Sequence, residues 1–569
     1  MKILYTSFIV FWFSCTLIKK NEPTLKVSPM TLCGTLTSDM DWYATHQHAP
    51  LLEGLGSLNY KITTANPLVQ QYFNQGLKLA YAFNHAEAAR SFYTAIQIDS
   101  TCAMCHWGFA YVLGPNYNAG MEPDNYTRAY AAVQKAIQWS GDVSKKEKEL
   151  ITALSSRYVK EPVENRYSLD STYSRELTKL FAIYPNDPEI AALYVESILD
   201  LHPWDLWDKQ GQPKAWTPEI ISILENLLKQ FPDHPGLNHF YIHAVEASNQ
   251  PEKGLKSANL FDQGLMPGAG HLVHMPSHIY IRTGDYHQGS LANINAVKID
   301  SQYVETCHAL GIYPLAYFPH NFHFLAATAT FEGNRDWALM GAEKVRAHAN
   351  TALMKDPNWA TLQHYYLIPY FVKVKFGLWD SILATPESND SLAYIKSIRS
   401  FARGMAFLGK GDLVNAKAEL TQIETTSTDS TLIELTIWGI NSVKEIVDIA
   451  AHILKGEILA KEGDFASSIK LLREAVAMED QLNYNEPPDW FFSVRHHLGA
   501  VLLENKNYEE AIKVYQEDLK WLPKNGWAQH GLKKAYTELK DEKSLNTIIN
   551  ELQQSWKYAD IHLQTSRIL

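Results

Sequence analysis

Residues 279–300 read I-Y-I-R-T-G-D-Y-H-Q-G-S-L-A-N-I-N-A-V-K-I-D, and this stretch decides which fold the sequence predicts. On both sides of Gly284-Asp285-Tyr286 the residue pattern has the period of a helix. Glycine tolerates the left-handed conformation that ends a helix. The same arrangement recurs at 401–420, 456–475 and 499–523. In the first two of these stretches the turn reads Gly411-Asp412-Leu413 and Gly463-Asp464-Phe465. The pattern predicts pairs of helices joined by tight turns.

Small residues recur at one place in these units, at Gly76, Gly108, Gly404, Gly456, Gly499 and Gly531. Together with the turns, they resemble tetratricopeptide repeats, which are helix-turn-helix units of about 34 residues. The resemblance runs from about Leu68 to the C-terminus and implies an all-α superhelix of stacked helix pairs. We divide it into N-terminal and central repeats at 67–390 and C-terminal repeats at 391–569. Proteins of this fold usually act as binding scaffolds, so the resemblance predicts the fold better than the function.

The N-terminus resembles a bacterial lipoprotein signal. Met1-Lys2 is followed by the apolar run Ile3–Ser14 and then by Cys15. The resemblance implies export to the periplasm or outer membrane of a bacterium, with a lipid anchor on Cys15. A plain cleaved signal peptide and an uncleaved anchor are the alternatives. We expect residues 16–66 to form a linker and a leading segment.

Composition and net charge limit the classes of protein to which the chain can belong. The chain has 569 residues, of which 46% are hydrophobic and 20% are charged, which excludes global disorder. The net charge is −11 and no basic stripe is present, so we expect no nucleic-acid partner. Apart from Cys15 there are four cysteines, which is too few for a disulfide scaffold.

Histidines are concentrated in one part of the chain: ten of the 22 lie between His234 and His323. In the tetratricopeptide family, helix positions 2, 5, 9, 12 and 13 line the inner, concave groove. Transferred residue by residue, the resemblance places these side chains in the groove: His239, His243, Glu246, His271, His274, His278, His320, His323 and, one unit later, His364. Histidines three or four residues apart share one face of a helix.

Imidazoles from neighbouring helices can reach a common ion, because packed helices lie about 8 to 10 Å apart. We therefore predict a metal site for Zn, Fe, Cu or Ni rather than Ca or Mg. More than four candidate ligands suggest two ions, or one ion with additional histidines that transfer protons. Glu246 is a candidate ligand or general base, and Asn238, Asn321 or backbone carbonyls are candidates for holding the rings. The predicted function is a metal-dependent hydrolase or oxidoreductase.

Other interpretations remain open. The histidines also suit a polar groove of a non-enzymatic scaffold that binds a peptide, a glycan or a partner protein. Pro276 lies inside the histidine motif, so a helix can begin there and leave His271 and His274 on the preceding loop. We expect Pro369 to kink its helix. The insertion 202–207 is expected to form a loop that folds over the groove.

A second motif competes with this site. Cys102-Ala103-Met104-Cys105-His106 matches the C-x-x-C-H pattern of c-type haem attachment. In that alternative the two thiols bind the porphyrin and His106 ligates the iron. The surrounding residues also fit the first helix of a repeat, however, and no cytochrome-like domain surrounds the motif. We predict no covalent haem here, but a packed pair of small residues, with a disulfide or a soft-metal site as further alternatives.

Overall fold

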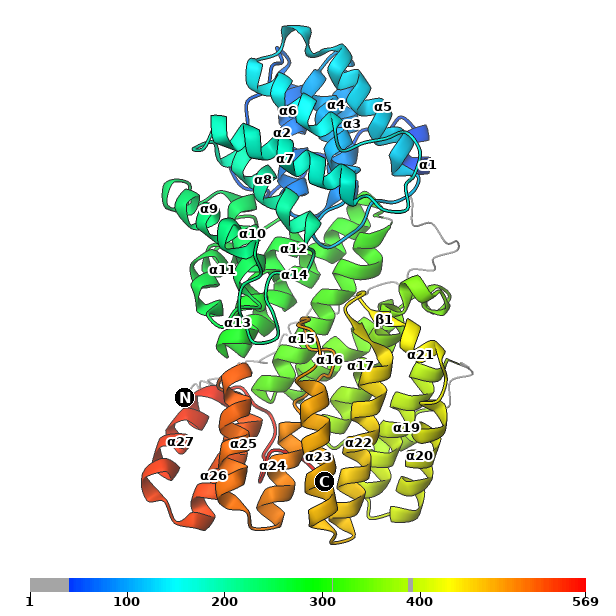
Figure 1. Cartoon of the computed structure of the whole chain (residues 1–569), viewed down its shortest axis with the longest axis vertical. Helices are drawn as coiled ribbons and strands as arrows, with labels where there is room; N and C mark the ends of the chain where they lie inside the picture. The colour runs from blue at the N-terminus through cyan, green and yellow to red at the C-terminus, as the bar shows by residue number, and fades with distance from the viewer. Residues whose placement is uncertain (1–39, 310, 387–391) are drawn as a thin grey trace, which may run out of the picture. The chain divides into compact units, whose positions relative to one another are not determined.

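The computed structural model describes residues 40–309, 311–386 and 392–569. The predicted signal segment, with Cys15, and Cys33 lie outside the described residues. Helices make up nearly all of the regular structure (Figure 1), and the predicted all-α fold is confirmed. The only strands among the described residues are β1 (Thr436–Ile437) and β2 (Asn441–Ser442), which form a short antiparallel hairpin.

The helices of the first half of the chain are α1 Met40–Ala44, α2 Pro67–Tyr81, α3 His85–Ile98, α4 Ala103–Val112, α5 Asn125–Gln138, α6 Lys145–Ser155, α7 Tyr167–Ile183, α8 Pro188–Leu201, α9 Thr217–Gln230, α10 Pro235–Val245, α11 Leu255–Asp262, α12 Gly270–His274, α13 Pro276–Thr283 and α14 Tyr286–Cys307. Those of the second half are α15 Phe318–Glu332, α16 Arg335–His348, α17 Thr361–Lys375, α18 Trp379–Ala384, α19 Ala393–Gly409, α20 Leu413–Thr426, α21 Thr431–Glu434, α22 Val443–Lys461, α23 Phe465–Glu479, α24 Arg495–Glu504, α25 Tyr508–Trp521, α26 Gly526–Leu539 and α27 Glu542–Ser555.

The predicted Gly-Asp turns join consecutive helices. Gly284, Gly411 and Gly463 have φ angles of 78°, 79° and 89°, a region in which side chains other than hydrogen are strained. The aspartate after two of these glycines caps the next helix: Asp412 accepts a hydrogen bond from the backbone N–H of Asn415, and Asp464 accepts one from that of Ser467. Each Gly-Asp pair therefore ends one helix and begins the next.

Close helix packing explains the recurring small residues. Gly76 on α2 and Gly108 on α4 both face the ring of Phe92 on α3, and an added Cβ at either glycine would collide with that ring. Gly499 on α24 and Gly531 on α26 face Tyr515 on α25 in the same way. One aromatic ring thus fills the space between three successive helices, as the repeat pattern predicts.

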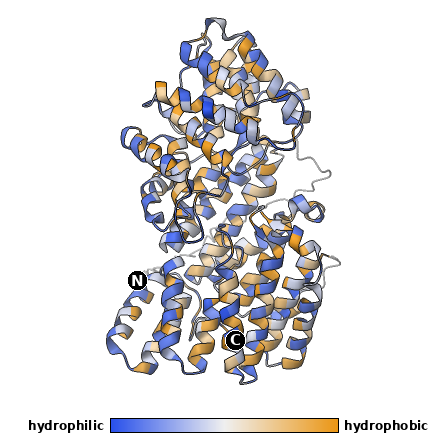
Figure 2. Cartoon of the chain, in the orientation of Figure 1, coloured by the Kyte–Doolittle hydropathy of each residue, from blue (hydrophilic) through white to orange (hydrophobic). Residues whose placement is uncertain are grey.

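Two hydrophobic cores meet within the central helices. One extends from Ala49 to Tyr317 and the other from Ile281 to Ile548, so their sequence ranges overlap from α13 to the segment just before α15. The leading segment before α2 belongs to the first core, since Ala49, Leu55 and Ile62 are buried. Most helices carry both hydrophobic and hydrophilic residues (Figure 2), which is typical of helices with one buried face.

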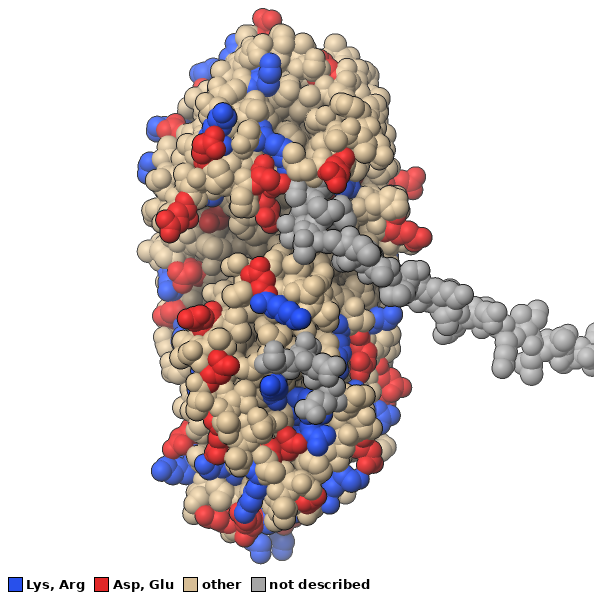
Figure 3. Space-filling model, turned by 90° about the vertical axis from the view of Figure 1, so that its right-hand side faces the viewer, with Lys and Arg blue, Asp and Glu red and all other residues tan. Residues whose placement is uncertain are grey.

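Charges of both signs share the surface. On the face drawn in Figure 3, Lys and Arg are interspersed with Asp and Glu, so this face has no field of a single sign. Within the described ranges, none of the helices combines the length and the hydropathy needed to span a membrane.

Candidate metal centre

Three neighbouring segments carry the central histidines. Helix α10 begins at Pro235, where the ring of His234 accepts a hydrogen bond from the backbone N–H of Leu237. His239 and His243 follow on one face of α10. A new helix, α13, begins at Pro276, as expected from the missing N–H of proline. His271 and His274 lie on the short helix α12 before it and not on a loop, and His278 lies on α13.

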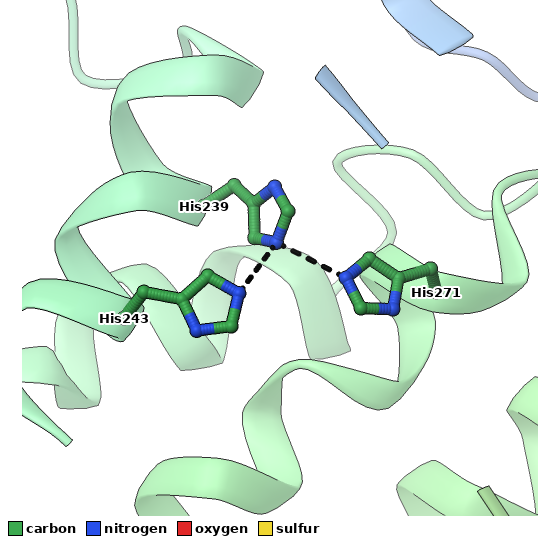
Figure 4. Close-up of side chains that lie close together, drawn as sticks. All are labelled: His239, His243 and His271. Carbon is green, nitrogen blue, oxygen red and sulfur yellow. Dashed lines mark hydrogen bonds between the residues drawn. The ribbon is translucent and has the colours of Figure 1, made fainter. Parts of the chain in front are cut away.

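The first histidine group consists of His239, His243 and His271 (Figure 4). The Nε2 atom of His239 lies 3.1 Å from that of His243 and 3.2 Å from that of His271. All three side chains are buried. Three imidazole nitrogens, contributed by two helices, therefore converge on one point.

The second histidine group, His274, His278 and His320, adjoins the first. The Nε2 atoms of His274 and His278 are 3.0 Å apart. The ring of His320, in the first turn of α15, lies 5.0 Å from the ring of His274 and 5.9 Å from that of His278 between centroids. The rings of His243 and His278 are 5.6 Å apart, so the two groups are neighbours.

Hydrogen bonds on the far side of the rings decide the tautomer. The Nδ1 atom of His239 lies 2.7 Å from the backbone carbonyl oxygen of Tyr81, and that of His243 lies 3.0 Å from Glu246 Oε1. Both partners are acceptors, so each ring donates its Nδ1–H and keeps a lone pair on Nε2. His274 is held by the side-chain oxygen of Asn293, at 2.7 Å.

These tautomers bring two Nε2 lone pairs together, between His239 and His243, at 3.1 Å. Such a pair is stable only with a cation between the two nitrogens, which is either a shared proton or a metal ion. Metal–nitrogen bonds of about 2.0 to 2.1 Å place neighbouring ligands about 2.9 to 3.3 Å apart in octahedral or tetrahedral geometry. The observed spacing fits this range.

The electrostatics of the first group oppose protonation. Burial and the neighbouring His243 hold the pKa of His239 well below its usual 6.5, and burial and His239 do the same to the pKa of His271. Burial alone would also lower the pKa of His278, but the carboxylates of Glu246 and Glu486 raise it to about 10. A proton is therefore disfavoured in the first group, whereas His278 attracts one in the absence of a metal.

Glu246 lies behind the rings. Its Oε1 accepts from Nδ1 of His243, and its Oε2 lies 2.8 Å from Nδ1 of His278. Both carboxylate oxygens therefore face the outer nitrogens of the histidines and not the point where the Nε2 atoms converge.

Two predicted residues lie apart from the two groups. His323 stacks on Phe491, with ring centroids 5.7 Å apart and nearly parallel planes, and its nearest histidine ring is that of His364. The Nδ1 atom of His364 in turn lies 2.9 Å from the hydroxyl oxygen of Tyr394. Residues 320 and 323 are about 60° apart around a helix, so only His320 points to the cluster.

One of the suggested kinds of ring-holding group is present, since the backbone carbonyl of Tyr81 holds His239, but the two suggested asparagines do not hold the rings. Asn238 donates to the backbone carbonyls of Pro232 and His234, and Asn321 donates to Asp300. Asn293 and Glu486 were not anticipated. Glu486 accepts from His278 across 208 residues of sequence, and no local pattern around it signals this contact.

A cavity of about 370 Å³ opens beside both groups. Its wall includes His243 and His271 of the first group and His278 and His320 of the second. The rest of the wall comes from loops far apart in sequence, among them 115–120, 203–204 and 438–440. Trp204, in the insertion expected to fold over the groove, lines this cavity.

The competing cysteine motif lies at the start of α4. The Sγ atoms of Cys102 and Cys105 are 2.7 Å apart, and Nε2 of His106 lies 3.0 Å from the backbone carbonyl oxygen of Ser100. All three side chains are buried. The absence of covalent haem stays a prediction.

Comparisons with known proteins add little to this geometry. No family model and no curated protein matches the sequence. Among solved structures, the chain is similar to a human IFIT1 dimer with m7Gppp-AAAA, at 11% identity and a TM-score of 0.30 over 89% of this chain and 92% of that one. It is also similar to the TPR domain of P58(IPK), at 12% identity and a TM-score of 0.21 over 87% and 99%. A third similar structure is the APC/C hetero-tetramer Cut9-Hcn1, at 13% identity and a TM-score of 0.22 over 86% of this chain and 96% of that one. Likeness at this level carries no argument about function.

The class of protein therefore follows from the chain itself. It is an all-α helical-repeat protein with two adjoining histidine groups, buried except for the partly exposed His320, beside a cavity.

Proposed function

We propose that the chain is a metalloprotein that binds one transition-metal ion at His239, His243 and His271 and a second at His274, His278 and His320. The observation that carries this proposal is that the Nε2 atoms of His239 and His243 lie 3.1 Å apart, each with a lone pair. Both rings keep this lone pair because their Nδ1–H groups donate hydrogen bonds elsewhere. Six neutral imidazoles suit Zn, Cu or Fe better than Ca or Mg.

Glu246 has a positioning role in this proposal. Its Oε1 accepts from Nδ1 of His243 in the first group, and its Oε2 lies 2.8 Å from Nδ1 of His278 in the second as an ion-pair partner. A carboxylate behind a ligating imidazole fixes the ring orientation and raises its basicity. This assigns Glu246 to orienting the ligands rather than to binding the metal or transferring protons.

The cavity makes an enzyme the favoured function. Histidines of both groups line it, so a bound molecule would lie next to either ion. A metal ion there would supply Lewis-acid or redox chemistry to a small substrate. We propose a metal-dependent hydrolase or oxidoreductase. A redox-active ion such as Cu or Fe would favour the oxidoreductase, because Zn does not itself change its oxidation state.

Elemental analysis of the purified full chain tests the metal proposal. We expect about two transition-metal ions per chain, and near-complete loss of both in the double variant His243→Ala/His278→Ala, which removes one ligand from each group. His323→Ala is the matched control, since it also removes a buried imidazole but one outside both groups. Circular dichroism establishes that the helices remain.

Two results would overturn the proposal. One is wild-type protein that takes up no transition metal even after incubation with Zn or Cu salts. The other is metal content that the double variant leaves unchanged. Either result would favour the alternative, a non-enzymatic repeat scaffold in which a shared proton links His239 and His243 and the groove binds a protein or peptide.

Export and a lipid anchor on Cys15 are part of the same proposal, although they concern residues outside the described ranges. Their support is the apolar run Ile3–Ser14 followed by Cys15.

A further inference from the structure

We propose that the cavity beside the histidine groups binds one aromatic ring that is neutral or carries a cationic substituent. This inference deepens the proposed function by naming its substrate class. It rests on the proposed function for the chemistry, but the binding of the ring depends on the cavity wall alone.

Aromatic side chains form the wall next to the first histidine group. Tyr117 and Trp204 stack on each other with ring centroids 5.3 Å apart. Both contact His243, at 5.0 Å and 5.7 Å between centroids. Aromatic rings favour stacked and edge-to-face neighbours, and a planar ring is the shape that such a wall accommodates best.

Further aromatic and apolar side chains line the cavity. The ring of Tyr317 lies 5.1 Å from that of His271, and Trp438 lies at the tip of the β1–β2 hairpin. Ile312 and Ile440 are also on the wall. A volume of about 370 Å³ with apolar and aromatic walls is typical of sites for small organic molecules.

Several polar groups on the wall are already hydrogen-bonded within the protein, which leaves only isolated polar atoms for a ligand. Asn116 accepts from the backbone N–H of Asn118. The amide of Asn485 donates to Asp489 and its oxygen accepts from the backbone N–H of Glu486. Glu486 accepts from both His278 and Tyr484. The buried wall atoms without a hydrogen-bond partner are Asn118 Oδ1, Asp200 Oδ1, His271 Nδ1 and the hydroxyl oxygen of Tyr317. Such isolated atoms can pair with one hydroxyl group on an aromatic ring, whereas a sugar has several hydroxyl groups that each need partners.

The charge of the wall selects against anions. Among the described residues that line the cavity, Asp200 and Glu486 are acidic and none is Lys or Arg. Asp200 is paired with Arg157, at 2.7 Å, which lies outside the wall. The one wall residue that can be cationic in metal-free protein, His278, is already paired with Glu246 and Glu486, each at 2.8 Å. A carboxylate on the ligand would therefore meet like charge and no unpaired cation on the described part of the wall.

Binding to the metal-free full chain tests this inference independently of the metal. Three probes share a phenol ring and differ in charge: tyramine is cationic, p-cresol is neutral and 4-hydroxyphenylpropionate is anionic. Methyl glucoside is the sugar probe. Titration calorimetry should show binding of tyramine and p-cresol, about tenfold weaker binding of the anionic probe, and no binding of the glucoside.

A pair of tryptophan variants locates the site. Trp204→Ala removes part of the aromatic wall and should weaken p-cresol binding about tenfold. Trp216→Ala is the matched control, because Trp216 lies just before α9, stacks on His202 of the insertion and does not line the cavity. It should bind p-cresol as the wild type does.

Three outcomes would overturn the inference: no binding of p-cresol and tyramine, tighter binding of the glucoside than of p-cresol, or equal effects of the two tryptophan variants. Failure of the metal proposal is a separate result, because it appears in elemental analysis. A chain that binds metal but no ring would contradict this inference alone, and a chain that binds the ring but no metal would contradict the metal proposal alone.

Discussion

His278 on α13 and Glu486 lie 2.8 Å apart, between Nδ1 and Oε2, although 208 residues separate them in the sequence. Both side chains are buried. The contact links the segment that precedes α24 to the second histidine group. Glu486 also lines the cavity, so it connects the two features on which the proposed function depends.

This relationship predicts the effect of Glu486→Gln. The amide keeps an acceptor for His278 but removes the charge that raises the basicity of the ring, and we expect metal affinity to fall about 10- to 100-fold. Competition with a chromophoric chelator measures this change.

Glu332→Gln is the control for that prediction. Glu332 accepts from Nδ1 of His287 at 2.9 Å, which makes it a similar buried partner of a histidine away from the cluster. Equal losses of affinity in the two variants would show that the effect is not specific to the site.

The packing of glycines on aromatic rings predicts a stability effect. A side chain at Gly499 would collide with Tyr515, so Gly499→Val should destabilise the fold by about 1 to 3 kcal/mol through overpacking. Thermal unfolding followed by circular dichroism measures it. Gly141→Val is the control, because the space around Gly141 is open, and an equal shift in the thermal midpoint there would contradict the packing argument.

The buried amine of Lys375 predicts a pH dependence. Burial holds its pKa well below the usual 10.5, against the opposing charge of Asp518. Between these two pKa values the unfolded state binds a proton that the folded state lacks, so the contribution of Lys375 to stability rises with pH through this window. Lys375→Met should therefore flatten the rise of the thermal midpoint on the alkaline side of neutrality.

Lys373→Met is the control for this slope. Lys373 is paired with Glu343 at 2.9 Å and does not share the buried position of Lys375. The slope is the quantity to compare, because the loss of the hydrogen bonds of Lys375 to His496 and Ser566 lowers stability at every pH. A slope that Lys375→Met leaves unchanged would contradict the prediction.

The cysteine motif predicts a negative spectroscopic result. Cys102 at the N-cap of α4 contacts Cys105 in its first turn, and the ring of His106 contacts the backbone carbonyl of Ser100. We expect no pyridine haemochrome band from full-length protein expressed with its own N-terminal segment. A band that Cys102→Ser removes would make electron transfer the leading function.

The N-terminal segment predicts the distribution of the protein between membrane and soluble fractions. If lipid is attached to Cys15, Cys15→Ser should move the protein from membranes into the soluble fraction. Fractionation followed by immunoblotting measures this change, and an unchanged distribution would argue against the anchor.

Much of the fold follows from local sequence, because its signals are local. Gly411 and Gly463 mark turns since glycine accepts positive φ, and the aspartates after them cap the next helix. Gly108 marks a close helix contact since Phe92 occupies the space of a side chain. These effects act within one or two helices, and together with the resemblance to tetratricopeptide repeats they allowed the repeat to be predicted from the sequence.

Part of the histidine cluster was also predictable. His239 and His243 are four residues apart, so helical geometry places both rings on one face. The repeat register placed α10, α12 and α13 side by side, and the Nε2 atoms of His239 and His271 do converge.

Only the tertiary structure decided the rest. It separated His323 from His320, because a three-residue step rotates a side chain by about 60° toward α17 and Phe491. It brought Glu486, Tyr117 and Trp204 to the same cavity from loops. It directed Glu246 at the outer nitrogens of the rings. Such contacts depend on how distant segments pack, and a periodic pattern carries no information about packing at long range.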